Sequence, residues 1–229
     1  MAWTSLITHL SQILNGAGLT ILLVSTSLMI GFCIAVSLSL CIISNKYWLK
    51  NIVNSYIFFI RGTPLLVQFF LIYYGIGQFT WLQHSFLWIF FKSPFCCAML
   101  TLALNTSAYS CELFTSAINS VPKGELDACK ALGMSGWLSL RRIIAPHAWR
   151  LVLPAYSNEI VMLVKASSLA STITMLELMG MTQQLINRTF LTIEFYCLAG
   201  FIYLIINNLL LIGFKILEKN LTKYSIQHQ

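Results

Sequence analysis

Five long apolar runs constrain this chain of 229 residues more than any other feature. A helix needs about 20 mostly apolar residues to cross a hydrocarbon core of roughly 30 Å. Runs of this length predict spanning helices at about Gly18–Ile43, Ile57–Phe79, Phe95–Ile118, Leu151–Leu176 and Ile193–Leu217. A water-soluble domain of this size would not hold so many. We therefore expect an all-α integral membrane protein with a single transmembrane domain over residues 1–229.

The basic residues orient these helices. With the N-terminus outside and the C-terminus inside, most lysines and arginines fall on the inner side, where the loops of membrane proteins are enriched in them. These inner bases are Lys46, Lys50, Arg61, Lys123, Lys130, Arg141, Arg142, Arg150, Lys215, Lys219 and Lys223. Only Lys92 and Arg188 fall outside, and Lys165 lies within a span. We attribute the net charge of +7 to flanks that face anionic lipid, not to nucleic-acid binding.

One charged segment, about residues 120–150, interrupts the apolar chain between the third and fourth predicted spans. Pro122 suits the first turn of a helix, and Asp127 lies early, where an acid complements the helix dipole. Gly133 suits the end of this helix, and Ser135 suits the cap of a second one. The segment predicts a short helix–turn–helix on the cytoplasmic side that docks on another protein.

Polar residues on the third predicted span follow helical spacing. Thr101, Asn105, Tyr109, Glu112 and Ser116 are separated by 4, 4, 3 and 4 positions, which places them on one face. Polar side chains within a membrane are costly unless they face protein or water. This face is either a polar contact between helices or the wall of a path for a solute. The acid favours the path.

The fourth predicted span carries Glu159 and Lys165, which lie about 120° apart on an ideal helix. Lys165 is either a counter-ion to Glu159 or Glu112, or a direct partner of a solute. The hydroxyl-rich run that follows, which includes Ser167 and Ser168, is too polar for a lipid-facing helix. It predicts a broken or cavity-lining segment of the kind that transporters use.

The second predicted span begins with a break at Arg61-Gly62-Thr63-Pro64. We expect Thr63 as the N-cap and Pro64 as the first residue of a new helix. This leaves Asn51–Ile60 as a separate apolar helix near the inner surface. Arg61 is expected to anchor at that surface, and a chemical role for it is the less favoured alternative.

Motifs that would supply energy or chemistry are missing from the sequence. It has no GxxxxGK[ST] loop for phosphates, no HExxH pair and no Gly-rich dinucleotide turn. The seven cysteines and four histidines form no CxxC pair or Cys/His cluster, so we expect no metal site and no disulfide framework. We expect no enzyme and no cofactor in this chain. Uphill transport would need an ion gradient or a separate ATPase, and a folded docking segment favours the ATPase.

The docking segment resembles the EAA loop of ABC importer permeases. That loop reads EAA, three residues, glycine, nine residues and I-x-L-P, and this chain keeps the spacing. The positions are filled by Asp127, Ala128, Cys129, Gly133, Ile143 and Pro146. The chain departs from the family in Asp127 for Glu, Cys129 for Ala and Ala145 for Leu. Aspartate keeps the charge, and the other two side chains stay small.

Three further stretches are similar to the polar amino-acid family of these permeases, which serves histidine, glutamate, glutamine, arginine and opines. They are RGTPLLVQFFLIYYGIGQF (61–79), LALNTSAYSCELF (102–114) and YSNEIVMLVKASSLASTIT (156–174). The chain looks most like the M-type permeases of bacterial arginine importers. The resemblance therefore covers nearly the whole chain.

The resemblance implies a type I importer in a bacterial inner membrane, which this chain would cross several times. Two permease subunits, identical or different, would surround a central path within the lipid. Two cytoplasmic ATPase subunits would lie below and a periplasmic or surface binding protein above. ATP and Mg²⁺ would be held by the ATPases. The substrate implied is L-arginine or another polar or basic amino acid.

For such a substrate, Glu159 and Glu112 are candidates for its two cationic groups, and Asn105 for its carboxylate. The full set of candidate path residues is Asn105, Tyr109, Glu112, Glu159, Lys165, Ser167 and Ser168. A gradient-driven amino-acid carrier or channel is the alternative, and it leaves the EAA-like loop unexplained. An assembly factor would explain that loop but not the polar face of the third span.

Overall fold

The computed structural model describes residues 2–44 and 46–226, and within these ranges every regular element is a helix. The α-helices are α1 (Ala2–Ile43), α2 (Tyr47–Gly62), α3 (Leu65–Phe70), α4 (Thr80–Gln83), α5 (Trp88–Phe91), α6 (Pro94–Asn119), α7 (Lys123–Ala131), α8 (Gly136–Ser139), α9 (Ala145–Ala166), α10 (Leu178–Thr189) and α11 (Thr192–Ile226). Between them lie π-helical turns at Leu71–Gly75 (η1) and Leu140–Ile144 (η3), and 3₁₀ segments at Ile76–Gln78 (η2) and Ser167–Ile173 (η4). The predicted all-α class is confirmed.

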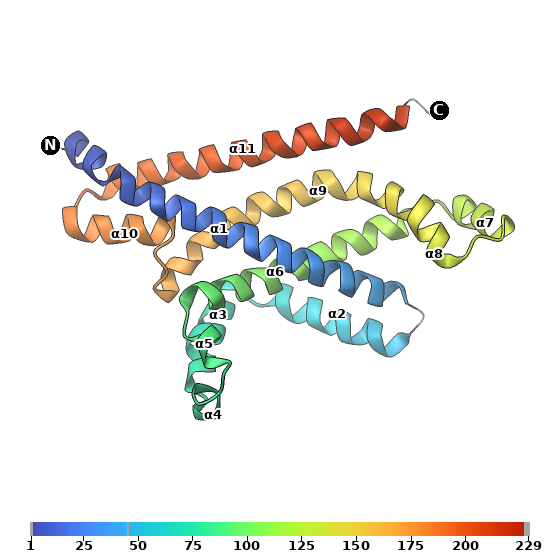
Figure 1. Ribbon diagram of the computed structural model, residues 1–229, viewed down its shortest axis with the longest axis horizontal. Coiled ribbons are helices and arrows are strands. Elements are labelled where there is room, and N and C mark those ends of the chain that lie inside the picture. The colour runs from blue at the N-terminus through green and yellow to red at the C-terminus, as the bar shows by residue number, and fades with distance from the viewer. Residues whose placement is uncertain (1, 45, 227–229) are drawn as a thin grey trace.

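Helices α1, α6 and α9 form the centre of a bundle. α1 packs along α6, and α9 packs against both α6 and α11 (Figure 1). One buried apolar cluster includes Leu102, Ile173 and Phe195, and a second includes Phe114 and Tyr156. The pair α7–α8 lies at one end of the bundle and α10 at the other (Figure 1).

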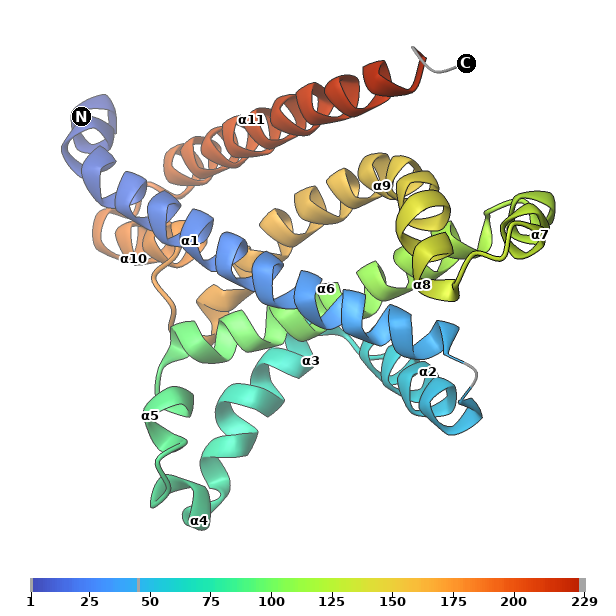
Figure 2. The ribbon, with the colours of Figure 1, turned by 45° about the vertical axis from the view of Figure 1, so that its right-hand side comes forward.

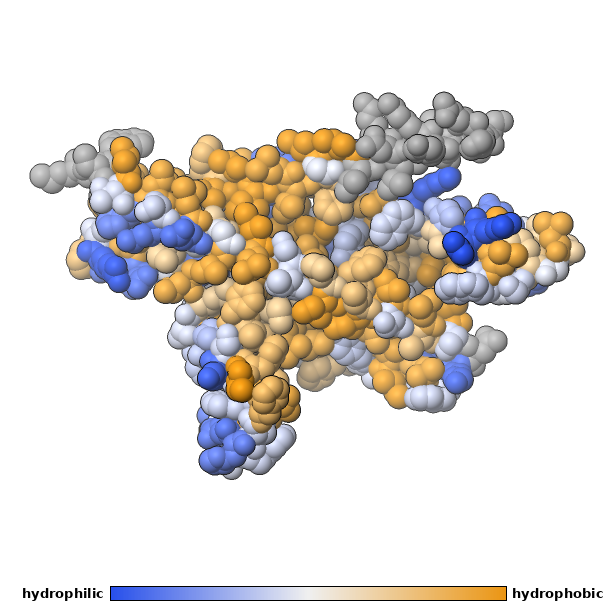
Figure 3. All heavy atoms as spheres, in the orientation of Figure 1, coloured by the Kyte–Doolittle hydropathy of each residue, from blue (hydrophilic) through white to orange (hydrophobic). Residues whose placement is uncertain are grey.

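Two helices are long and apolar enough to cross a membrane alone, Leu6–Ile43 and Thr192–Ile216. Counting each of two bent pairs, Tyr47–Gly62 with Leu65–Gln78 and Gly136–Ile173 with Leu178–Thr189, as one span raises the number to four. The predicted fifth span rests on α6, whose 26 residues extend for about 39 Å but carry the polar stripe. Figure 3 shows hydrophobic residues over the middle of the visible face and hydrophilic ones toward its extremities.

The predicted break after Arg61 is present, and the chain turns by 103° between α2 and the segment 65–78. Pro64 cannot donate a helical hydrogen bond, and Thr63 before it is extended, with φ −112° and ψ 141°. The predicted cap is wrong. Pro64 itself takes the N-cap position of α3, and Thr63 Oγ1 donates back to the Phe59 carbonyl at 2.9 Å.

Gln68 closes the open end of α2. Its Nε2 donates to the carbonyls of Ile60 and Thr63 at 2.7 and 3.2 Å, and its side chain is buried. Carbonyls at the end of a helix need partners from outside that helix, and this amide supplies them without water. The bend is therefore fixed from within. Beyond it, the segment from α3 to α5 forms an arm that projects from the bundle (Figure 2).

The predicted helix–turn–helix begins as expected. Gly133 has a φ of 68°, and the Met134 amide donates to the Cys129 carbonyl at 3.0 Å, which closes α7. Ser135 Oγ then accepts from the Leu138 amide at 3.3 Å. The second helix is not separate, however, because α8, η3 and α9 follow one another without a non-helical residue. A π-helical turn, η3, joins α8 to α9.

Candidate functional site

The bend between α2 and α3 borders a cavity of about 450 Å³, which we call the Arg61 cavity. Helices α6 and α9 complete its wall. The polar residues that line it are Arg61, Thr63, Asn105, Tyr109 and Glu159. A second cavity of about 370 Å³ shares Arg61, Tyr109 and Glu159 and adds Glu112 and Ser116. Arg61, in the last turn of α2, therefore lines both cavities together with residues of α6 and α9.

Arg61 is the cation of both cavities. Its guanidinium forms an ion pair with Glu112 and lies 5.0 Å from the centroid of the Tyr109 ring. The side chains of the pair are 38% and 52% exposed, so they face open space and not the packed interior. The structure thus places Arg61 beside the polar residues Tyr109 and Glu112 of α6.

Glu159 faces the Arg61 cavity from α9. Its Oε1 accepts a long hydrogen bond of 3.4 Å from Thr106 Oγ1, and it forms no ion pair with any residue in the described ranges. Across the cavity, Asn105 Nδ2 donates to Gln68 Oε1, also at 3.4 Å. A carboxylate, a guanidinium, an amide and a phenol thus line one space of small-molecule size. Such a set can bind a ligand that carries both charges.

The predicted stripe on α6 is a cavity wall over most of its length. Asn105 and Tyr109 line the Arg61 cavity, and Glu112 and Ser116 line the second one. Thr101 is different, because it is fully buried and donates to the Cys97 carbonyl at 2.7 Å. The first residue of the stripe is therefore a packing residue.

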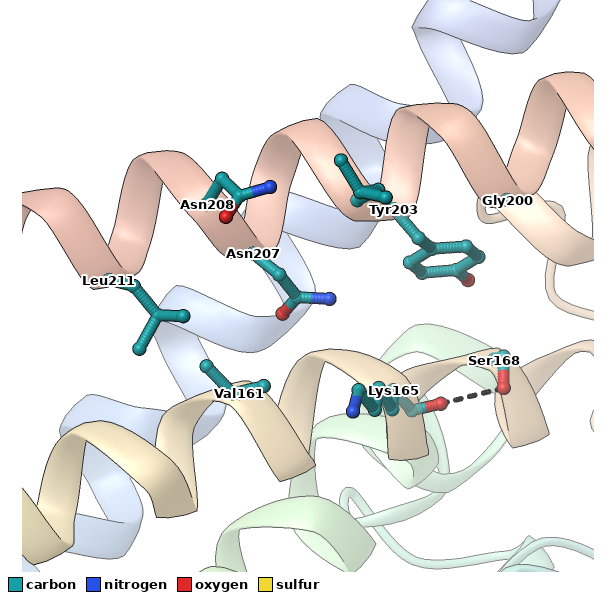
Figure 4. Close-up of a pocket in the computed structure, with 9 residues that line it drawn as sticks. Val161, Lys165, Ser168, Gly200, Tyr203, Asn207, Asn208 and Leu211 are labelled. Atoms are coloured by element: carbon teal, nitrogen blue, oxygen red, sulfur yellow. Dashed lines mark hydrogen bonds between the residues drawn. The ribbon is translucent and has the colours of Figure 1, made fainter.

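Lys165 and Ser168 lie apart from these cavities. They line a groove of about 670 Å³ between α9 and α11, which we call the α9–α11 groove, opposite Tyr203, Asn207 and Asn208 (Figure 4). The Lys165 side chain is exposed, and within the described ranges it pairs with neither candidate acid. The six positions between Glu159 and Lys165 thus turn the two charges toward different spaces.

Ser167 lines neither the cavities nor the groove. It is buried, and its hydroxyl donates to the Val164 carbonyl at 2.8 Å. The structure therefore brings four of the seven candidate path residues together and leaves three outside that group. The three are Lys165, Ser167 and Ser168.

The residues of the EAA-like loop are mostly accessible to a partner. Exposed are Asp127, Ala128, Gly133 and Pro146, while Ile143 is half-buried and Cys129 is buried. Leu132 and Trp137 flank the turn and are 78% and 71% exposed. Large apolar side chains at the polar end of the molecule form a surface suited to protein contact.

Comparison with known proteins decides the family. Residues 27–223 match the family described as "Binding-protein-dependent transport system inner membrane component". The chain belongs to this family. It is therefore an inner-membrane subunit of a binding-protein-dependent transport system, and its role is that of a permease and not of an ATPase.

Individual relatives narrow the comparison. The chain is 47% identical over 195 residues to the octopine transport system permease protein OccM of Rhizobium meliloti, covering 85% of this chain and 80% of that protein. It is 42% identical over 216 residues to the arginine ABC transporter permease protein ArtM of Haemophilus influenzae, covering 94% and 95%. A crystal structure of an amino acid ABC transporter with histidines matches with a TM-score of 0.85 at 28% identity, covering 95% and 97%. The predicted membership of the polar amino-acid ABC permeases is confirmed.

Sequence reasoning passed over Gln68 and Glu177. A glutamine four residues after a break is no recognised signal, and the neighbours of Arg61 follow only from how α2 packs on α6. Glu177 did carry a signal, because an acid directly after an apolar run is unusual in a membrane protein. It is fully buried.

Proposed function

We propose that this chain is the five-span permease of an ATP-driven importer of L-arginine or a related basic amino acid. The spans are α1, the bent pair of α2 with the segment 65–78, α6, α9 and α11, with the N-terminus outside. The observation that carries the proposal is the Arg61 cavity, in which Glu159 has no ion-pair partner among the described residues. The permease names of the relatives, which mention arginine and octopine, support this substrate class.

A basic amino acid carries two positive groups and one negative group, and the cavities offer partners for all three. Glu159 is the cavity acid that forms no ion pair within the described ranges, so we assign it to the side-chain cation of the substrate. Arg61 and Asn105 donate to the carboxylate, because a guanidinium and an amide both present N–H groups. Glu112, which Arg61 already holds, receives the ammonium group. Tyr109 closes the site from α6.

Lys165 and Ser168 offer a second position for the carboxylate. Lys165 lies about 9 Å further along α9 than Glu159, Ser168 follows in η4, and both line the α9–α11 groove. We propose that the substrate passes this position after or before the Arg61 cavity. Ser167, buried at the C-terminal end of α9, would support this segment without contacting the substrate.

The coupling segment would seat α7 in a groove of a cytoplasmic ATPase that binds ATP and Mg²⁺. Asp127 and Ala128 face outward on α7, and the exposed Leu132 and Trp137 extend the contact. The hydrogen-bonded turn at Gly133 makes α7 a firm lever. A second permease subunit, identical or related, and a periplasmic or surface binding protein complete the assembly.

Equilibrium binding of labelled arginine to the purified complex tests the site. Glu159→Gln should weaken binding at least about tenfold, since a charged hydrogen bond is lost. Glu194→Gln is the matched control, because Glu194 lies on α11 away from the cavities and should keep wild-type affinity. Unchanged affinity in Glu159→Gln would sink the assignment. Preferential binding of histidine or glutamine would replace arginine as the proposed substrate. Uptake without the ATPase would favour a gradient-driven carrier.

A further inference from the structure

Glu177, just before α10, is fully buried and serves as a hydrogen-bond acceptor for three helices. Its Oε2 accepts from Thr20 Oγ1 at 3.2 Å, from the Met179 amide at 2.9 Å and from the Tyr203 hydroxyl at 3.0 Å. Its Oε1 accepts from the Gly180 amide at 2.9 Å. One carboxylate thus joins α1, α10 and α11, and we call this group the Glu177 knot.

The knot is tightly packed. Thr20 Oγ1 also accepts from the Leu178 amide at 3.0 Å, so α1 caps α10 directly. A Cβ atom at Gly180 would overlap the Met175 carbonyl oxygen, and one at Gly16 would lie 3.2 Å from the Glu177 carbonyl oxygen. Close backbone approach of this kind leaves the three helices little freedom to shift relative to one another.

The chain just before the knot has the opposite character. Residues 167–174, here called the strap, form the 3₁₀ segment η4 and end at Thr174, whose φ of 64° is rare for a β-branched residue. The helix direction changes by 49° between Ile173 and Leu178. A 3₁₀ stretch between two α-helices is a frequent sign of a hinge.

The strap lies beside the Arg61 cavity. It begins directly after Ala166, which lines that cavity, and it packs against α3 and α6. At its other end, Thr174 Oγ1 lies 3.4 Å from the Tyr73 hydroxyl of the arm. The strap therefore borders the cavity, and it lies at the end of α9 that is away from α7 and α8 (Figure 1).

We propose that Glu177 is a positioning residue of the transport cycle, and that its knot is the fixed anchor against which the strap opens and closes the outer end of the Arg61 cavity. This inference rests on the proposed function. A hinge transmits motion only if one end is held, and the knot holds the strap to α1 and α11. The Tyr203 hydroxyl is the contact by which Glu177 holds α11. It matters because little of the apolar segment Thr192–Ile216 of α11 is buried against the rest of this chain.

Tyr203→Phe tests the anchor with little change in shape, since it removes one hydroxyl from the knot. Loss of a hydrogen bond to a charged group should loosen the anchor and let the strap open without a signal from the binding protein. The ATP hydrolysed per arginine imported by the reconstituted complex should then rise about threefold to tenfold. Complexes purified by size before reconstitution exclude ATPase subunits that lack a folded permease, so loss of folded protein does not move this ratio.

Tyr56→Phe is the matched control. The Tyr56 hydroxyl is also hydrogen-bonded, to the Leu104 carbonyl and Ser107 Oγ at 2.8 and 2.7 Å. It lies on α2, however, which contributes no residue to the knot. Its ATP-to-arginine ratio should match the wild type. An unchanged ratio in Tyr203→Phe, or an equal rise in both variants, would overturn the proposal.

Hydrogen exchange in the wild-type complex decides the same question without a variant. The amides of residues 178–180 should stay protected in both the resting and the ATP-trapped states, while those of the strap should change. Exchange of the 178–180 amides in the trapped state would show that the knot opens and is no anchor. A wild-type complex that imports no arginine would count against the proposed function instead, and the exchange pattern would still decide the anchor.

Discussion

The coupling turn after α7 and the Glu177 knot both begin as helix caps, yet they are built in different ways. Ser135 caps the amide of Leu138, three residues ahead, and the turn is exposed except for the half-buried Met134. Glu177 also caps its own helix, but the same carboxylate binds Tyr203 and Thr20, which lie 26 and 157 residues away. One cap is local and open to a partner, and the other is shared and buried.

This difference predicts that substitutions in the two regions affect different properties of the protein. A buried acceptor shared by four donors leaves several polar groups unsatisfied when it is removed, which costs more free energy than the loss of an exposed cap. Changes at the knot should therefore act mainly on folding and on the hinge. Changes at the coupling turn should leave the fold intact and act on the contact with the ATPase.

The largest loss of stability is expected for Glu177→Ala. The hydroxyls of Thr20 and Tyr203 and two backbone amides lose their acceptor in a buried site, so the free energy of unfolding should fall by about 4 kcal/mol or more. Thermal or denaturant unfolding of the purified permease measures this loss. Glu194→Ala, outside the knot, should change stability little. A loss below about 1 kcal/mol for Glu177→Ala would contradict the role of the knot.

Gly180→Ala should come next. The added methyl group would overlap the Met175 carbonyl oxygen, and overpacking of this kind costs about 1–3 kcal/mol. Gly213→Ala is the control, because nothing lies within 4 Å of its Cβ position on α11. Alanine there should be neutral or slightly stabilising. Equal unfolding midpoints for the two variants would show that α10 can move away from the strap.

Gln68→Leu probes the bend between α2 and α3. Gln68 resembles the coupling turn in that its partners are near in sequence, and it resembles the Glu177 knot in that it is buried. The carbonyls of Ile60 and Thr63 would lose their donor, at a cost of about 1–3 kcal/mol. Arginine binding should weaken together with stability, because Thr63 and Pro64 of the bend line the Arg61 cavity. Gln78→Leu, exposed on the arm, serves as the comparison. A stable variant with normal binding would mean that Pro64 alone sets the bend.

The smallest effect on stability is expected for Gly133→Ala. A side chain at a φ of 68° costs about 1 kcal/mol, and the site is exposed. Gly136→Ala, in the first turn of α8 with open space around it, should be silent. Unfolding and ATP-driven uptake measured side by side should show a larger loss of uptake than of stability. A loss of stability comparable to that of Glu177→Ala would erase the distinction between the two regions.

The coupling turn was predictable because its determinants lie within a few residues of one another. Gly133 and Ser135 act through the backbone rules that govern any helix end. The Arg61 cavity was predictable only in part: the spacing of Asn105 and Tyr109 placed them on one face, but the motif at Arg61 did not state the angle of the bend. That angle depends on how α3 packs.

The Glu177 knot could not be predicted, because its determinants are far apart in sequence. No residue near Glu177 indicates that Thr20 and Tyr203 are its partners, since these side chains meet only when α1, α10 and α11 pack together. The positions of Lys165 and Glu159 show the same limit. Their helical angle was correctly derived, but which spaces they face depends on α2 and α11.

Uptake of labelled arginine into proteoliposomes tests the central claim most directly. The vesicles would hold this chain with its ATPase, second permease and binding protein, and Asp127→Arg would run beside the wild type. We predict uptake that needs ATP and every component, and that is lost in Asp127→Arg while arginine binding at the Arg61 cavity and thermal stability remain. Uptake that persists without the ATPase, or that is normal in Asp127→Arg, would contradict the account.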